Sequence, residues 1–160
     1  MDETQYRALY LTAEDLEDLA PKESVHTAEP DPGDAAYPRL GGIRSGFQGW
    51  ERWEDGDLVR RLVDIRWVFP KEEAARAYHG ERAKENSEGF RPLPPPTAIL
   101  GEGSLMFQGN DPFGLGLEMH IHLFTVGPVA AKVFTSGLPE GERLKACFLA
   151  ARRLQQAFGR

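Results

Sequence analysis

The sequence contains one cysteine, Cys147, so no disulfide bond can form within the chain. A chain of 160 residues can nevertheless bury a core large enough to fold without disulfides or bound metals. No apolar run approaches the roughly 20 residues that a membrane-spanning helix needs. The first residues also lack the basic and apolar stretches of a secretory signal. These absences predict a cytoplasmic protein that has no membrane partner.

Several enzyme motifs are absent as well. There is no Gly-x-Ser-x-Gly of the esterase type, no phosphate-binding loop that ends in Lys-Ser or Lys-Thr, and no dinucleotide fingerprint. We therefore expect no cofactor. The sequence leaves catalysis open but favours a protein that is not an enzyme.

Charge is unevenly distributed along the chain, which has a net charge of −6. Residues 1–36 carry ten acidic and two basic side chains, whereas residues 37–160 carry fifteen acidic and seventeen basic ones. No clustered basic face is evident, which argues against a nucleic-acid partner. Residues 21–42 are rich in Pro, Gly and acidic side chains and have no hydrophobic period, so we expect a mobile acidic surface loop there.

Hydrophobic periodicity predicts most of the secondary structure. Two extended runs, 43–53 and 58–69, flank Asp55-Gly56, which is a strong hairpin signal. Pro70 starts a predicted helix over 71–87, which has two glutamates, Glu72 and Glu73, in its first turn. Further strands are expected at 104–108, 117–126 and 129–135. A closing helix over 138–158 places an apolar stripe toward the core, formed by Leu144, Phe148, Ala151, Leu154 and Phe158.

The resulting order is β-β-α-β-β-β-α. This order predicts an α+β fold, in which a mainly antiparallel sheet packs two main helices on one side. No repeat or boundary divides the chain, so we expect one domain over residues 1–160.

The segment 117–123 offers the most suggestive chemistry. Strand alternation places Met119 and Ile121 toward the core and Glu118, His120 and His122 on the opposite, open face. Two histidines and a carboxylate can share a metal ion, although a ligand from another element would have to complete the site. The alternative is an open polar sheet face without a metal.

The same open face is expected to carry Asp64 and Arg66 from the earlier strand. A face that combines Arg, Asp, Glu and His could bind a ligand, or it could be a solvated ladder of charge pairs. Trp50 and Trp53 are three residues apart and therefore face opposite sides of a regular strand, so one of them is expected to be exposed and to line a groove or a partner surface. The expected ligand-binding residues are Trp50, Asp64, Arg66, Glu118, His120 and His122.

The stretch from Gly46-Phe47-Gln48 to Phe69-Pro-Lys-Glu-Glu-Ala-Ala-Arg-Ala-Tyr78 resembles a layout found in bacterial sensor-type and lipoprotein domains. In that layout an extended Gly-Phe segment leads to a strand ending in Phe, then a helix of the form x-x-x-Ala-x-x-x-Tyr and a closing amphipathic helix. Such domains resemble the photosystem II extrinsic P subunit, which has an antiparallel sheet between helices. The resemblance spans residues 43–158 and implies a binding module that is not an enzyme.

The sequence therefore favours a bacterial, non-catalytic binding or interaction domain. Its ligand would be a small molecule or a protein on an open sheet face or in an adjacent groove. The first alternative is a metal-binding protein or metal-dependent enzyme that uses His120, His122 and Glu118. The second is a homo-oligomer whose sheet edge or aromatic side chains form the interface.

Overall fold

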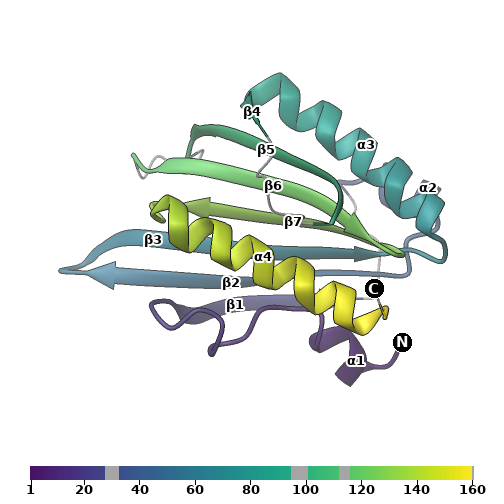
Figure 1. The fold of residues 1–160 in the computed structure, drawn as a ribbon, viewed down its shortest axis with the longest axis horizontal. Coiled ribbons are helices and arrows are strands. Elements are labelled where there is room, and N and C mark those ends of the chain that lie inside the picture. Colours follow the sequence, from purple (N-terminus) through teal and green to yellow (C-terminus); the bar gives the residue numbers. More distant parts are fainter. Residues whose placement is uncertain (28–32, 95–100, 112–115, 160) are drawn as a thin grey trace.

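A computed structural model describes residues 1–27, 33–94, 101–111 and 116–159. Within them, seven strands form one antiparallel sheet in the order β1-β2-β3-β7-β6-β5-β4 (Figure 1). The strands are β1 (Ala20–Thr27), β2 (Arg44–Glu54), β3 (Asp57–Val68), β4 (Arg91–Leu93), β5 (Glu102–Asn110), β6 (Glu118–Val126) and β7 (Val129–Ser136). The helices are α1 (Glu3–Arg7), α2 (Ala36–Arg39), α3 (Glu72–Gly89) and α4 (Glu140–Ala157). None of the described helices is long and apolar enough to span a membrane.

The order of the strands follows from two meanders. β1, β2 and β3 lie side by side, and α3 then carries the chain to the far edge of the sheet. β4 to β7 return strand by strand until β7 pairs with β3 at the centre. Every pairing is antiparallel, which confirms the predicted α+β class with two main helices.

The predicted hairpin between β2 and β3 is confirmed. Glu54 pairs with Asp57 across a two-residue turn, and both turn residues, Asp55 and Gly56, have positive φ, 51° and 82°. A type I′ turn requires this conformation at both positions, because it follows the twist of the flanking strands. Asp and Gly tolerate it better than other residues.

The two main helices lie on opposite faces of the sheet, which corrects the expectation that both pack on one side (Figure 1). α3 covers one face of β5, β6 and β7 through two clusters. The members of these clusters are Ala36, Tyr37, Phe69, Ala75, Tyr78 and Ala130, and then Phe107, Met119, Ile121 and Leu123. The physical reason is that both faces of the central strands carry apolar side chains, so each face needs its own cover.

α4 covers the other face, with its small side chains toward the sheet. Ala146, Cys147, Ala150 and Ala151 are at most 2% exposed. Phe148 is 43% exposed, so its expected place on the buried stripe is wrong. Alanine contributes little to a hydrophobic pattern, but it lets a helix approach the sheet closely. Close packing therefore turns the small residues inward and Phe148 outward.

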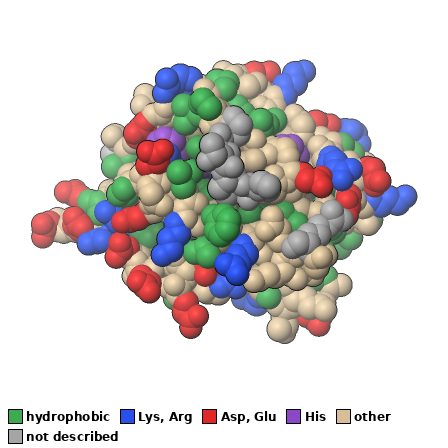
Figure 2. Space-filling model, in the orientation of Figure 1, with side chains coloured by type: hydrophobic (Ala, Val, Ile, Leu, Met, Phe, Trp, Pro, Cys, Tyr) green, Lys and Arg blue, Asp and Glu red, His purple; other side chains and the backbone are tan. Residues whose placement is uncertain are grey.

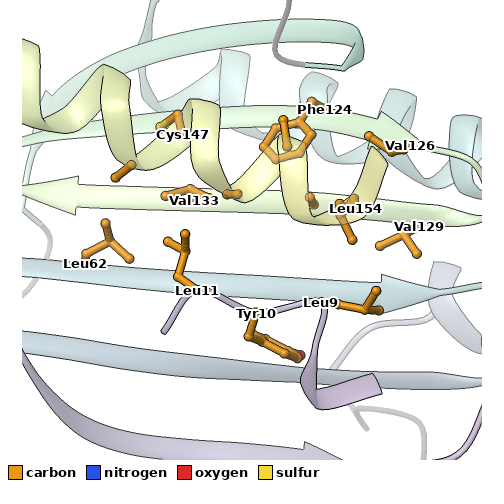
Figure 3. Packing of buried hydrophobic residues seen from close by; sticks show 14 of the residues in the cluster. Leu9, Tyr10, Leu11, Leu62, Phe124, Val126, Val129, Val133, Cys147 and Leu154 are labelled. Atoms are coloured by element: carbon orange, nitrogen blue, oxygen red, sulfur yellow. The ribbon is translucent and has the colours of Figure 1, made fainter. Parts of the chain in front are cut away.

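The N-terminal segment, residues 6–19, covers the part of this face that α4 does not reach. Its buried side chains are Tyr6, Leu9, Tyr10, Leu11, Leu16 and Leu19. Figure 3 shows Leu9, Tyr10 and Leu11 over β2 and β3, beside the α4 residues Cys147 and Leu154. Arg153 of α4 holds this segment through Asp15, with Nη2 and Oδ2 2.6 Å apart.

Residues 20–27 form strand β1, where the sequence predicted part of a surface loop. β1 pairs with β2 from Ala20 opposite Glu51 to Thr27 opposite Ser45. Most of its side chains are exposed, so it shows no hydrophobic pattern although its backbone bonds to the sheet. Residues 28–32 of the expected loop lie outside the described residues, and α2 follows at Ala36. The expected mobility stays a prediction.

The close contact between α4 and the sheet predicts that Ala150→Leu lowers the free energy of unfolding by about 1–3 kcal/mol, because the added atoms have no space. The matched control is Phe148→Ala on the exposed side of α4, which we expect to cost less than about 1 kcal/mol. Urea unfolding followed by circular dichroism measures both. A larger loss for Phe148→Ala than for Ala150→Leu would contradict the orientation of α4.

Candidate functional site

One part of the sheet has no described helix over it. α3 packs against β5, β6 and β7 and reaches β3 at Trp67, whose ring lies 5.0 Å from that of Tyr78, while the same face of β1, β2 and the rest of β3 lies beyond it. The register aligns Val25, Phe47 and Ile65 in one cross-strand row on this face. A second row aligns Gly49, Val63 and Phe134. We call this uncovered, largely apolar area the open face.

A pocket of about 240 Å³ lies on the open face. It is lined by Lys22, Glu23, Phe47, Gly49, Trp50, Glu51, Arg61, Val63, Ile65 and Phe134. Its floor is apolar, and its rim carries two cations and two carboxylates. The guanidinium carbon of Arg61 lies 5.6 Å from the ring centre of Phe134, which is within cation–π range.

β1 comes close enough to wall the pocket because Gly49 has no side chain. A Cβ atom at Gly49 would lie 3.3 Å from the carbonyl oxygen of Glu23. On the β7 side of the pocket, next to its lining, Lys132 of β7 aligns with Ile65 of β3. Burial lowers the pKa of Lys132, while Glu85 of α3 opposes this shift, so α3 lies next to Lys132. The pocket therefore combines an apolar floor with charged groups from several elements.

Asp64 and Arg66 lie on the opposite face from the pocket. Both side chains are fully buried under the N-terminal segment, which corrects their expected place on an open face. Arg66 Nη2 and Asp64 Oδ1 are 2.8 Å apart, with angles outside those of a hydrogen bond. The backbone N–H of Leu11 donates to Asp64 Oδ2 at 2.9 Å, and Arg66 Nε donates to the carbonyl of Leu9 at 3.5 Å. The pair thus fastens the N-terminal segment to the sheet.

Trp50 and Trp53 do face different environments, as predicted. Trp53 is 56% exposed near the hairpin tip, where its Nε1 donates to Glu51 at 2.9 Å. Trp50 is buried in the core on the face that the N-terminal segment and α4 cover, yet it also contributes to the lining of the open-face pocket. Of the six residues expected to bind a ligand, Trp50 alone lines this pocket.

The predicted alternation of β6 is confirmed, but its polar face is covered. Met119, Ile121 and Leu123 pack under α3, whereas His120 and His122 lie beneath α4. Glu118 is exposed at the start of the strand, with Oε1 3.9 Å from His120 Nε2. Burial, then the charges of Arg143 and His120, lower the pKa of His122 from 6.5 to about 3.

The metal alternative gains no support from the residues that the structure describes. Among them, no group of three or more His, Cys, Asp or Glu side chains is arranged to hold a metal ion. Both ring nitrogens of His122 are buried, and neither has a hydrogen-bond partner among the described residues.

The sequence did not predict the other nine lining residues, among them Phe47, Val63, Ile65 and Phe134 of the apolar floor. Their signal was present, because β3 carries apolar residues at every second position. A periodic apolar row usually indicates a core face, however, and only the limited reach of α3 leaves this row open. The polar side chains of Asp64, Arg66, His120 and His122 instead predicted that the opposite face of the sheet is the open one. That face carries α4, and charged groups of both signs are interspersed over it (Figure 2).

Neither a protein-family model nor a curated protein matches the sequence. The structure is similar to the crystal structure of the extracellular domain of PknH from Mycobacterium tuberculosis. The TM-score is 0.71 at 12% sequence identity, and the match covers 100% of this chain and 98% of that chain. The two chains share a fold over their full length.

This similarity corrects one expectation and supports another. The predicted cytoplasmic location is contradicted, because the similar structure is an extracellular domain. The resemblance to bacterial sensor-type domains is confirmed in part, because the shared fold is that of a bacterial extracellular domain.

The buried ion pair predicts a large loss of stability when one partner is removed. Asp64→Ala leaves Arg66 as an uncompensated buried charge, so we expect the free energy of unfolding to fall by about 3–5 kcal/mol. Removing both charges with Asp64→Leu and Arg66→Met should recover much of this loss. Urea unfolding of the three variants measures the effect. A double variant as unstable as the single one would contradict the role of charge.

His122 predicts a loss of stability in acid. In the unfolded chain the imidazole binds a proton near pH 6.5, but in the folded protein only near pH 3. The unfolded state therefore binds more protons between these values. The stability is fully present above pH 6.5 and is lost as the pH falls, by up to about 1.4 kcal/mol per pH unit.

The measurement compares the wild type with His122→Gln by urea unfolding from pH 7.5 to 4. We expect the difference between their stabilities to shrink toward low pH, because the variant cannot take up this proton. Parallel pH profiles for the two proteins would show that His122 does not contribute.

Proposed function

We propose that this chain is a non-catalytic binding domain whose ligand, a small molecule or a segment of a protein, lies in the open-face pocket. The observation that carries this proposal is the pocket itself, an apolar concavity on a part of the sheet that no described helix covers. An exposed apolar surface with a charged rim is costly for an isolated protein and typical of a binding site.

The lining residues indicate the kind of ligand. Phe47, Ile65 and Phe134 offer rings and a branched side chain to an apolar group. Arg61 and Lys22 on one hand, and Glu23 and Glu51 on the other, offer charge to its polar ends. Val25, 42% exposed in the same row as Phe47, extends the apolar surface toward β1. A ligand with an apolar body and polar termini fits this arrangement.

The composition of the pocket also favours binding over catalysis. Its lining includes no His, Cys, Ser or Thr, and therefore no imidazole base and no hydroxyl or thiol nucleophile. Cys147 is fully buried on the opposite side of the sheet, and burial raises the pKa of its thiol, so it is not a nucleophile for this pocket.

The similar extracellular domain supports two further parts of the proposal. Its match spans this chain from end to end, as expected if residues 1–160 form a single domain. Its location supports a role for this chain outside the cytoplasm, where a binding domain meets external ligands.

The pocket predicts that Ile65→Glu abolishes ligand binding, because it places a carboxylate on the apolar floor. A library of small amphipathic molecules is screened by thermal shift, and hits are titrated by calorimetry. We expect binders whose affinity falls about tenfold or more in Ile65→Glu.

The control is Ile43→Glu, since Ile43 is 50% exposed and lies outside the pocket lining. Binders that Ile65→Glu does not weaken would place the ligand elsewhere. The solution mass, measured with the same samples, tests whether the open face instead pairs two copies of the chain.

A further inference from the structure

A second group of polar residues lies away from the open face, between the first half of α4 and the sheet. His120 and His122 extend from β6, and Thr135 of the neighbouring strand β7 pairs with His120. Arg143 extends from α4, and its charge lowers the pKa of both imidazoles. We call these four residues the α4 cluster. None of them contributes to the open-face pocket.

The α4 cluster contains buried polar atoms that have no hydrogen-bond partner in the part of the chain that the structure describes. They are Nδ1 and Nε2 of His122, Oγ1 of Thr135 and Nε of Arg143. His122 and Thr135 are at most 1% exposed, and Arg143 is 6% exposed. A buried polar group that makes no hydrogen bond costs about 1–3 kcal/mol. Four such atoms in one place indicate that another species normally satisfies them.

The charge of the cluster is also uncompensated. Within the described residues, no ion pair joins Arg143 to a carboxylate, although arginine is rarely buried unpaired. Glu118 and Glu140 are exposed, and both raise the pKa of His120. Glu118 stays 3.9 Å from His120. The amino-terminal end of α4 adds positive potential from its dipole.

We propose that the α4 cluster binds a small oxyanion such as sulfate, phosphate or a carboxylate. The guanidinium of Arg143 and the hydroxyl of Thr135 donate to it, and each imidazole donates through a ring N–H. The anion supplies the negative charge that Arg143 lacks and the acceptor atoms that the buried donors lack.

Binding of the anion is linked to protonation. A neutral imidazole has one N–H donor and one acceptor, whereas a protonated imidazole has two donors and a positive charge. An anion between the two histidines and Arg143 therefore favours protonated imidazoles, and acid favours the anion. The groups that face the histidines are Arg143, which opposes protonation, and Glu118 and Glu140, which favour it at the margin. On the same face Val133 separates His122 from Asp64, which pairs with Arg66. Cys147 of α4 is a thiol whose pKa burial raises, so it stays neutral.

The experiment titrates the full chain with sodium sulfate and follows the imidazole nitrogen shifts of His120 and His122 by NMR. Sulfate keeps its charge over this pH range, and sodium chloride holds the ionic strength constant. These shifts report local binding, whereas the melting temperature also responds to the general stabilising effect of sulfate. We expect saturable shifts and an affinity that increases from pH 7.5 to pH 5.5, by at most about tenfold per pH unit for each proton bound.

Two variants separate the site from its surroundings. Arg143→Gln should weaken sulfate about tenfold or more, whereas Arg152→Gln, an exposed arginine on the same helix, should leave it unchanged. If Arg143→Gln does not fold, Thr135→Val replaces it and should weaken sulfate several-fold. A titration with acetate in place of sulfate tests whether the site binds a carboxylate. Shifts that do not saturate, or equal affinity in Arg143→Gln and Arg152→Gln, would overturn the proposal and leave water as the partner of these atoms.

Discussion

The need to cover both faces of one seven-stranded sheet with two long helices organises this structure. α3 shields β5 to β7 on one face, and α4 shields β6 and β7 on the other. The N-terminal segment completes the second face with Tyr6, Leu9 and Leu11, while among the described residues no equivalent segment covers most of the first face of β1 to β3. The open-face pocket is a consequence of this unequal cover, because the uncovered strands keep the apolar side chains of a core face.

The covered face carries a cost that the open face does not. Covering β3 and β6 with chain encloses Asp64 and Arg66, and also His120 and His122, away from water. Asp64 and Arg66 neutralise each other and bond to the backbone of the N-terminal segment, so their burial also defines the path of that segment. Within the described residues His122 has no such partner, and burial, followed by the charges of Arg143 and His120, lowers the pKa of its imidazole. The two buried polar groups on this face therefore differ. Asp64 and Arg66 form an ion pair, whereas the ring nitrogens of His122 lack hydrogen-bond partners among the described residues.

Local patterns in the sequence predicted the elements that depend on neighbouring residues. The Asp55-Gly56 turn, the alternation of β6 and the existence of both long helices follow from turn chemistry and periodicity. The strand β1 was not predicted, because an edge strand is held by its backbone hydrogen bonds and its exposed side chains show no hydrophobic pattern. The orientation of α4 was predicted wrongly, because alanine contributes little to a hydrophobic pattern. Ala146 and Ala150 nevertheless form the contact with the sheet. Which face stays open depends on where α3 ends and how the N-terminal segment runs, and neither is encoded in a local window.

The same reasoning explains why polar residues were a poor guide to the pocket. A histidine pair on a strand suggests an accessible site only if its face is open, and α4 closes that face over His120 and His122. An apolar row such as Val25, Phe47 and Ile65 suggests a core only if something packs on it. The helices and the N-terminal segment do not cover all of this sheet. As a result, the polar pair is buried and the apolar row is partly exposed, which is the opposite of what each pattern suggests. In the two proposals above, the partly exposed apolar row forms the surface for an external ligand, and the buried polar group binds an anion with an affinity that responds to pH.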